Sequence, residues 1–400
     1  MSNSIVKFDF KGSKQILSEL DWSRSQNKRF SNLHSLASYL AMFCPALPSY
    51  FINKYSAEND LVMDNFSGRG TTALVCRELK RNFVGNDLNP YAYVLSKLKV
   101  STIWKTALLK RIDEIENEFN NWFKSDNKQK INIIENNEVL VYYSKSVYNQ
   151  LFFLREKYGK NWIKNADLEN AIIAFALSLM HGPIKKDSST IYFSLSMPNT
   201  ISMAPNYVKK FALSKKLIKP EGNIFEKIKN RVLSKFDDIL EKEYGGKIYF
   251  CDSTKPFSKI KNESVSLVVT SPPYLNMVNY TNSNWLKLWL LGYERIELNQ
   301  KIKLSDKFNF EKYCEFIFSY LNNIYPLIKK GGHICLIVGD VYDKELILDV
   351  WNVIKDKLAY EFVEIYYDYK YLQTHKVTHM LNSKIKNGTK IEKVLVLRKG

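Results

Sequence analysis

The sequence predicts an α/β fold built on an open, mainly parallel sheet. Short apolar runs that end in an acidic residue or a proline recur along the 400 residues, and stretches with the apolar spacing of a helix lie between them. The first of these runs passes through a glycine-containing loop directly into a helical pattern. Such a strand–loop–helix unit is typical of sheets whose strands run parallel.

The first strand is predicted over Leu61–Asp64, and the glycine loop that follows it is a candidate ligand site. Gly68 and Gly70 let the backbone approach a ligand or take a positive φ. The helix expected from about Thr71 offers free N–H groups at its start. The loop lacks the third glycine of a dinucleotide fingerprint and the lysine of a phosphate-binding P-loop.

Two further strands are each predicted to end in an acid. The strand that begins at Asn82 ends in Asp87, and the strand Lys247–Ser253 carries Asp252 near its end. An acid at the end of the second strand commonly binds sugar hydroxyls, so Asp87 is interpreted as a ribose ligand. The alternative for each acid is a turn or helix cap.

Residues 101–245 interrupt this pattern with a mainly helical insertion. Helices are predicted over Leu108–Phe123 and Leu168–Met180. Between His181 and Pro220 there are seven lysines and one aspartate, with three aromatic residues among them: Tyr192, Phe193 and Tyr207. Basic and aromatic side chains in one stretch suit contacts to nucleic acid. A solvated surface of a helical subdomain is the alternative.

A corner that can hold a planar base is predicted after the strand Val265–Val269. Pro272 and Pro273 end this strand because neither can donate a ladder hydrogen bond. The corner carries the hydroxyl of Ser271, backbone carbonyls that no sheet uses, and the ring of Tyr274. These groups can accept from an exocyclic amine and stack on the ring that bears it.

The remaining elements complete the sheet. An apolar helix pair is predicted over His34–Tyr55, and a helix over Tyr313–Leu327 that a lysine–glycine turn, Lys329–Gly332, ends before the strand His333–Val338. The last two strands, Glu361–Tyr369 and Lys393–Leu397, are expected to form a hairpin-like pair at one sheet edge. The basic loop between these two strands is a second candidate for DNA contact.

Composition limits the partners and the compartment. The formal net charge of +18 indicates a polyanionic partner. No run of 18 apolar residues and no signal-peptide pattern is present, so no membrane association is expected. Five scattered cysteines without metal-ligand spacing predict a reducing cytoplasm, with neither disulfides nor a zinc site.

The stretch Ser271-Pro272-Pro273-Tyr274 after an apolar strand resembles the catalytic motif of S-adenosylmethionine-dependent DNA amino-methyltransferases, which modify N4 of cytosine or N6 of adenine. Serine in the first position favours N4 of cytosine. The resemblance covers nearly the whole chain and is weakest from 101 to 165. It implies a Rossmann-like, seven-stranded methyltransferase sheet with the helical insertion between the second and third strands. Asn65 departs from the family, which often has proline there.

The resemblance also implies roles for individual residues. Ser271, Pro272, Pro273 and Tyr274 would be catalytic, and Tyr280 would line the base pocket. The stretch Ser38–Pro48 would close over the methionine end of the cofactor. Asp252 would bind the adenine amine. The expected contacts of S-adenosyl-L-methionine are Asp64, Phe66, Ser67, Gly68, Gly70, Thr71, Thr72, Asp87, Leu88 and Asp252, and no metal is expected.

The expected organisation is a catalytic domain in two halves, residues 1–100 with the cofactor loop and residues 246–400 with the Ser-Pro-Pro-Tyr motif. The insertion 101–245 would recognise the target. The expected function is site-specific methylation of a flipped base in double-stranded DNA within a restriction-modification system, with a separately encoded restriction endonuclease as partner. An N6-adenine enzyme, an RNA amino-methyltransferase and a non-catalytic nucleic-acid-binding homologue are the alternatives. The intact corner argues against the last of these.

Overall fold

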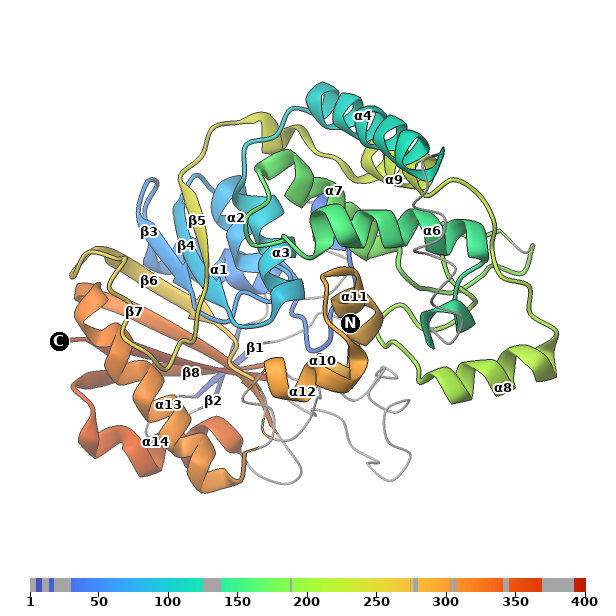
Figure 1. Cartoon of the computed structure of the whole chain (residues 1–400). Coiled ribbons are helices and arrows are strands. Elements are labelled where there is room, and N and C mark those ends of the chain that lie inside the picture. Colours follow the sequence, from blue (N-terminus) through green and yellow to red (C-terminus); the bar gives the residue numbers. More distant parts are fainter. Residues whose placement is uncertain are drawn as a thin grey trace.

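The computed structural model describes most of the chain. The described residues are 30–124, 138–187, 189–273, 275, 280–302, 304, 308–340, 345–368 and 392–400, together with the backbone of 5–8 and 14–17. Figure 1 shows a twisted sheet on one side of the molecule and the helical insertion on the other.

All seven predicted strands are present in one sheet, in the spatial order β5-β4-β3-β6-β7-β9-β8. The strands are β3 (Leu61–Asp64), β4 (Asn82–Asp87), β5 (Gly246–Phe250), β6 (Val265–Thr270), β7 (Ile328–Gly339), β8 (Tyr360–Asp368) and β9 (Glu392–Lys399). The neighbours from β5 to β7 are parallel, and β9 is antiparallel to both β7 and β8. This order confirms the predicted Rossmann-like α/β sheet.

An N-terminal hairpin extends this sheet and was not predicted. Strands β1 (Ile5–Phe8) and β2 (Lys14–Leu17) pair with each other, and β1 pairs antiparallel with β8. The last two predicted strands do pair with each other. Their expected place at a sheet edge was wrong, however, because β9 lies between β7 and β8 while β1 covers the outer side of β8.

Helices cover both faces of the sheet. One face carries α1 (Ala46–Tyr55), α2 (Thr71–Glu78) and α3 (Pro90–Val100), and the other carries α13 (Phe310–Ile324) and α14 (Leu346–Ile354). The buried strand residues alternate between two cores, one under α1 and α2 and one under α13 and α14. Short helical turns η7 (Tyr325–Leu327) and η8 (Lys355–Lys357) end the latter two helices.

The predicted helix pair over His34–Tyr55 is replaced by a single α-helix. The segment before it forms only the 3₁₀ turn η2 (Asn32–Ser35), and α1 begins after Pro45. Pro48 is accommodated in the first turn of α1, where the missing N–H has no partner within the helix to lose. The prolines therefore position the start of α1.

The lysine–glycine turn predicted at Lys329–Gly332 is part of strand β7 instead. The pairing of β6 with β7 shifts register between the pairs Val265–Ile328 and Leu267–His333. The extra residues form an irregularity in which Gly331 has a φ of +75°. The lysines and glycines that were predicted to end a helix therefore form a bulge within strand β7.

The insertion between β4 and β5 is helical, as predicted. Its elements are α4 (Lys105–Lys124), η3 (Glu138–Val141), α6 (Lys145–Leu154), the π-turn η4 (Arg155–Gly159), α7 (Asp167–Leu179), α8 (Pro205–Lys215), α9 (Ile224–Lys235) and η5 (Asp238–Glu241). Four short helices follow β6: α10 (Tyr280–Ser283), α11 (Trp285–Leu290), η6 (Arg295–Glu297) and α12 (Leu298–Lys301). The buried α11 belongs to the core of the insertion, where its two tryptophans, Trp285 and Trp289, are packed.

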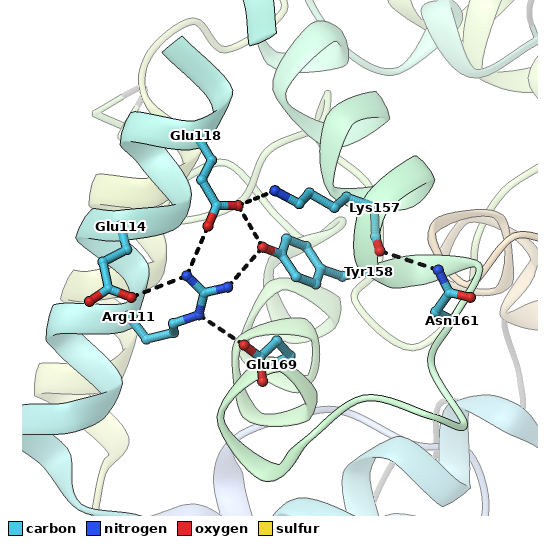
Figure 2. A network of polar contacts seen from close by, with 7 residues as sticks. All are labelled: Arg111, Glu114, Glu118, Lys157, Tyr158, Asn161 and Glu169. Atoms are coloured by element: carbon cyan, nitrogen blue, oxygen red, sulfur yellow. Dashed lines mark hydrogen bonds and ion pairs between the residues drawn. The ribbon is translucent and has the colours of Figure 1, made fainter. Parts of the chain in front are cut away.

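A polar network joins three elements of the insertion (Figure 2). Arg111 on α4 bridges Glu118 at 2.9 Å and Glu169 on α7 at 2.8 Å. The hydroxyl of Tyr158 in η4 donates to Glu118 at 2.7 Å and accepts from Arg111 at 3.0 Å. The network stabilises the relative positions of α4, α7 and the π-turn.

The two ends of the insertion meet beside α2. A side chain added at Gly246, the first residue of β5, would place its Cβ 2.9 Å from Cβ of Val100, the last residue of α3. The guanidinium of Arg77 donates to the carbonyls of Ser101 at 2.8 Å and Leu240 at 3.1 Å. One arginine thus holds the chain where it leaves the sheet layer and where it returns.

Candidate active site

A cleft of about 850 Å³, its open mouth included, lies at the carboxyl ends of β3, β4, β5 and β6. This is the sheet edge where open α/β folds bind their ligands. It brings together most of the residues predicted from sequence: Phe66, Ser67, Gly68, Thr71, Asp87, Leu88, Asp252, Ser271 and Pro273. The glycine loop and the Ser-Pro-Pro corner, about 200 residues apart in sequence, therefore face one cavity.

The acid at the end of β4 is held by backbone N–H groups. Oδ2 of Asp87 accepts from Gly68 at 2.8 Å, and Oδ1 accepts from Asn89 at 2.8 Å. Burial raises the pKa of Asp87 to about 6, against these two hydrogen bonds, which lower it. The carboxylate is thus fixed in orientation at the cleft wall.

The glycine loop needs its second glycine for packing. Gly70 has a φ of +74°, and a Cβ there would lie 2.9 Å from Oγ of Ser96 on α3. The left-handed conformation turns the chain into α2, whose first residue Thr71 lines the cleft. Gly70 and the fully buried Thr72 therefore build the loop from behind and do not line the cleft.

Asp64 is buried beneath the cleft. Its Oδ1 accepts from the hydroxyl of Thr270 at 2.6 Å and from the backbone N–H of Phe66 at 3.1 Å. Burial raises the pKa of Asp64 to about 6. Its role in the structure is to join the glycine loop to the end of β6, next to the buried Pro272.

Asp252 follows β5. A ligand-binding residue and a turn cap were the predicted alternatives for this acid, and the structure shows it both capping a turn and lining the cleft. Its Oδ1 accepts from the backbone N–H and from the hydroxyl of Thr254, both at 2.8 Å, which is a turn cap. The residue also lines the cleft. The turn orients the carboxylate at the cleft wall.

Asn65, the departure from the family pattern, lies at the centre of a buried network. Its Nδ2 donates to Asn86 at 2.8 Å, its Oδ1 accepts from Tyr320 at 3.0 Å, and its carbonyl accepts from Ser253 at 2.7 Å. A proline could supply only the last of these contacts. The asparagine therefore ties β3, β4 and α13 together directly below the cleft.

The segment Tyr39–Phe43 covers the cleft from the N-terminal side. The ring of Tyr39 stacks on Tyr280 at 5.8 Å and on Tyr91 at 5.6 Å between centroids. Arg69 of the glycine loop donates to the carbonyl of His34 at 2.6 Å. Arg69 also donates to the carbonyl of Phe43 at 3.4 Å, which joins the cover to the glycine loop. That Ser38–Pro48 closes over the methionine end of a cofactor stays a prediction.

The corner after β6 opens into the same cleft. Ser271 and Pro273 line it, as does Tyr280 at the start of α10. Tyr274 and residues 276–279 lie outside the described residues. The ring predicted to stack on a base therefore remains an expectation from sequence.

A family model described as DNA methylase, of the N6/N4 methyltransferase type, matches residues 8–98 and 265–400. The chain belongs to this family. The two matched segments contain the glycine loop and the Ser-Pro-Pro corner, and the whole insertion 101–245 lies outside the match.

Known proteins with similar sequences are type II DNA methyltransferases. The chain is 22% identical to type II methyltransferase M.MjaII of Methanocaldococcus jannaschii, over 80% of this chain and 76% of that protein. It is also 22% identical to M.BsoBI of Geobacillus stearothermophilus, over 69% of this chain and 56% of that protein. Among solved structures, an rRNA methyltransferase, AviRa from Streptomyces viridochromogenes, aligns over 94% of each chain with a TM-score of 0.35 and 9% identity.

The methylase is thus an enzyme of the amino-methyltransferase class, and its family includes both N6 and N4 types. In the part of the chain that the structure describes, no helix has the length and hydropathy needed to cross a membrane. Among the described residues, Cys76, Cys251, Cys314 and Cys335 form no disulfide.

The predicted recognition stretch is only partly on the surface of the methylase. Phe193 is fully buried, so the expectation that it contacts nucleic acid was wrong, whereas Tyr207 is 53% exposed. Tyr192 is half-buried. Most of the basic loop before β9 lies outside the described residues.

Several cleft residues were missed from sequence. Asn89 caps α3 by accepting from the N–H of Tyr91 at 3.1 Å, while its Nδ2 donates to the hydroxyl of Tyr39 at 3.1 Å. The Asn-Pro pair at the start of a helix signals such a cap. No sequence signal pointed to Ser253 or Phe316, which reach the cleft from other elements.

Proposed function

We propose that this methylase transfers a methyl group from S-adenosyl-L-methionine to the exocyclic amine of a flipped base in DNA, with N4 of cytosine as the favoured target. The observation that supports this proposal best is the single cleft shared by the glycine loop, Asp87 and Ser271. Membership of the N6/N4 family supports the amino target, and serine before the two prolines favours cytosine.

The cleft residues fit the proposed cofactor. The fixed carboxylate of Asp87 suits ribose hydroxyls, and Asp252 at the next strand end suits the adenine amine. The cover Tyr39–Phe43 suits the apolar methionine end. When bound, the cofactor supplies an electrophilic methyl group next to the corner.

The chain's own residues would orient the base. A base in a duplex must leave the stack before its amine can enter the cleft. The hydroxyl of Ser271 and the carbonyl of Pro272 would accept from the amine and turn its lone pair toward the methyl group. The amine nitrogen would gain the methyl group as the bond from that group to the sulfonium sulfur breaks, which leaves a neutral thioether, and the amine would release one proton to water. Tyr274 would stack on the base. Because no covalent intermediate is needed, alignment of the amine with the methyl group and fixed dipoles would provide most of the rate.

The finer alternatives stay within this proposal. N6 of adenine requires the same corner, and an RNA amine would also fit it. A separately encoded restriction endonuclease is proposed as partner because the similar proteins are named type II methyltransferases. A DNA substrate and free thiols suit action in the reducing cytoplasm. The insertion 101–245 is proposed to recognise the target.

The test is incubation of the full chain with methyl-labelled cofactor and unmethylated genomic DNA, followed by digestion and mass spectrometry of the nucleosides. Label in N4-methylcytosine is the expected result. Label in N6-methyladenine would keep the mechanism and change the base. Absence of label in DNA, with the cofactor bound in calorimetry, would overturn the DNA proposal, and the same assay with RNA would then separate an RNA enzyme from a non-catalytic homologue.

A further inference from the structure

Helix α8 lies on the side of the insertion far from the sheet (Figure 1), and several of its aromatic and polar side chains are exposed. Tyr207 is 53% exposed and Phe211 is 37% exposed, and their rings stack at 6.1 Å with an angle of 7° between planes. Asn206, Lys210 and Ser214 are exposed on the same helix. Only Pro205 and Val208 of α8 are buried. The helix is therefore held along one side and open along the other.

The charge around α8 has a single sign. From Pro205 to Pro220 there are five lysines and no acidic residue. Some lysines elsewhere in the insertion are paired, as Lys229 is with Asp113 at 2.6 Å and with Glu116 at 3.1 Å. Lys209, Lys210 and Lys215 form no ion pair with a described residue. This surface suits a polyanion better than a protein, because lysine is depleted in the cores of protein interfaces.

The segment that leads into α8 is anchored at the mouth of the cleft. The N–H of Ser202 donates to the carbonyl of Ser283 in α10 at 2.7 Å. Nε1 of Trp285 donates to the carbonyl of Met203 at 3.3 Å. Ile201 packs against Leu40, which lines the cleft. The base of α8 is thus attached to the chain that follows the Ser-Pro-Pro corner.

The length of α8 sets how far it reaches from that anchor. Its 11 residues extend about 16 Å. The length of α8 is comparable to the width of the major groove, which is wide enough to admit a helix. The helix could therefore contact the duplex beside a base that is flipped into the cleft.

We infer that α8 lies against the DNA groove beside the flipped base, with Tyr207 and Phe211 on the base edges and Lys209 and Lys210 on the phosphates. This inference rests on the proposed DNA substrate. Phosphate contacts fix the register of a protein on the duplex, while contacts to base edges carry the sequence preference. Helix α8 would therefore contribute to the choice of site.

The test uses two double variants of the full chain, Tyr207→Ala/Phe211→Ala and Lys209→Ala/Lys210→Ala. The matched controls are Trp104→Ala, which removes an aromatic ring that is 58% exposed at the start of α4, and Lys110→Ala/Lys124→Ala, which removes two exposed lysines of α4. The measurements are cofactor affinity by calorimetry, binding to an unmethylated duplex by anisotropy at several salt concentrations, and steady-state methylation.

The expected result is a rise of tenfold or more in KM for DNA in the aromatic variant, with kcat within twofold and cofactor affinity unchanged. The lysine variant should lower the slope of log affinity against log salt by about 2, because two phosphate contacts are lost. Both controls should behave as wild type.

Wild-type values in both α8 variants, with methylation of DNA intact, would overturn this inference and leave the proposed function standing. A change from dimer to monomer in the aromatic variant, with DNA affinity unchanged, would show that a second copy covers the helix and would also overturn it. A wild-type protein that neither binds nor methylates DNA would remove both the proposed function and the role of α8.

Discussion

The hydroxyl of Thr270 donates a 2.6 Å hydrogen bond to the carboxylate of Asp64, across 206 residues of sequence. Thr270 is the last residue of β6, before the Ser-Pro-Pro corner, and Asp64 is the last residue of β3, before the glycine loop. Oγ1 of Thr270 also accepts from the N–H of Phe66 at 3.2 Å. One hydroxyl thus aligns the two loops that face the cleft.

Replacing Thr270 by valine should destabilise the protein by about 1–3 kcal/mol at pH 8, because a buried carboxylate loses a donor. The pKa of Asp64 is about 6 and would rise further in the variant. The difference from wild type should therefore shrink as the pH falls through 6, where Asp64 becomes neutral. Urea unfolding at pH 8 and pH 5 measures the difference in stability between the two proteins. Thr270→Ser should restore the hydrogen bond to Asp64. An equal loss at both pH values would contradict the assignment.

Cofactor affinity should depend on the ionisation of Asp87. Burial raises its pKa to about 6, so the carboxylate that would accept from ribose is lost below that pH. Calorimetry with S-adenosyl-L-methionine should show Kd rising up to about tenfold per unit as the pH falls from 6 to 5. Asp87→Asn should bind weakly with a flat profile. Asp64→Asn is the control, because Asp64 also has a raised pKa but does not line the cleft. If the Kd of Asp87→Asn still changes with pH, a group other than Asp87 causes the pH dependence.

Tyr39 should contribute to cofactor binding through its ring. Tyr39→Phe keeps the stacks on Tyr91 and Tyr280 and loses only the hydrogen bond from Asn89. Tyr39→Ala removes the stacks, should cost about 3–5 kcal/mol of stability and should open the cleft. Calorimetry at a temperature where both variants are folded should show weakened binding only in Tyr39→Ala. Equal affinities would mean that the cover does not contact the cofactor.

Lys287 should make the stability of wild type rise with pH. Burial lowers its pKa to about 7, and its Nζ donates only to neutral oxygens, Asn199 at 3.2 Å and Asn284 at 3.1 Å. The cost of the buried charge is fully present below pH 7 and is relieved as the pH rises toward the value of the unfolded chain. Relative to Lys287→Met, wild type should gain about 1.4 kcal/mol per unit between pH 7 and 10. Thermal unfolding of both proteins at several pH values measures this difference. If the stability of both proteins changes with pH in the same way, the pKa of Lys287 is not lowered.

The corner should control turnover. Ser271→Ala removes one acceptor for the amine, so methylation should slow more than DNA binding weakens. Tyr274→Ala should lose most activity and keep cofactor affinity. Steady-state methylation and calorimetry check both variants. Unchanged methylation in both would remove the corner from the proposed mechanism.

The sequence predicted the parts of the site that local chemistry determines. Strands that end in Asp64, in Asp87 and just before Ser271 are visible as apolar runs followed by a polar or glycine-containing stretch, and parallel strands bring such ends to one edge. Local sequence does not determine whether an acid lines the cleft or supports it from below, because that depends on contacts with distant residues. Asp64 was predicted to bind cofactor, yet its nearest donor is Thr270, which no sequence spacing connects to it.

The errors in the fold have the same origin. The pattern Lys329–Gly332 fits a helix end and a bulged strand equally well, and only the pairing of β7 with β6 decides between them. The position of β9 between β7 and β8 depends on long-range pairing, which neither strand encodes by itself. The expectation that Phe193 contacts nucleic acid failed because its burial depends on the packing of the whole insertion.

The contact between Val100 and Gly246 has an evolutionary consequence. Because the chain departs from and rejoins the sheet layer at one point, where Arg77 holds both sides, the 145-residue insertion can change in length without separating α3 from β5, provided that its core still packs on α3 and α11. Under the proposal that the insertion recognises the target, recombination at these two neighbouring positions would change the target sequence and leave the residues of the cleft as they are.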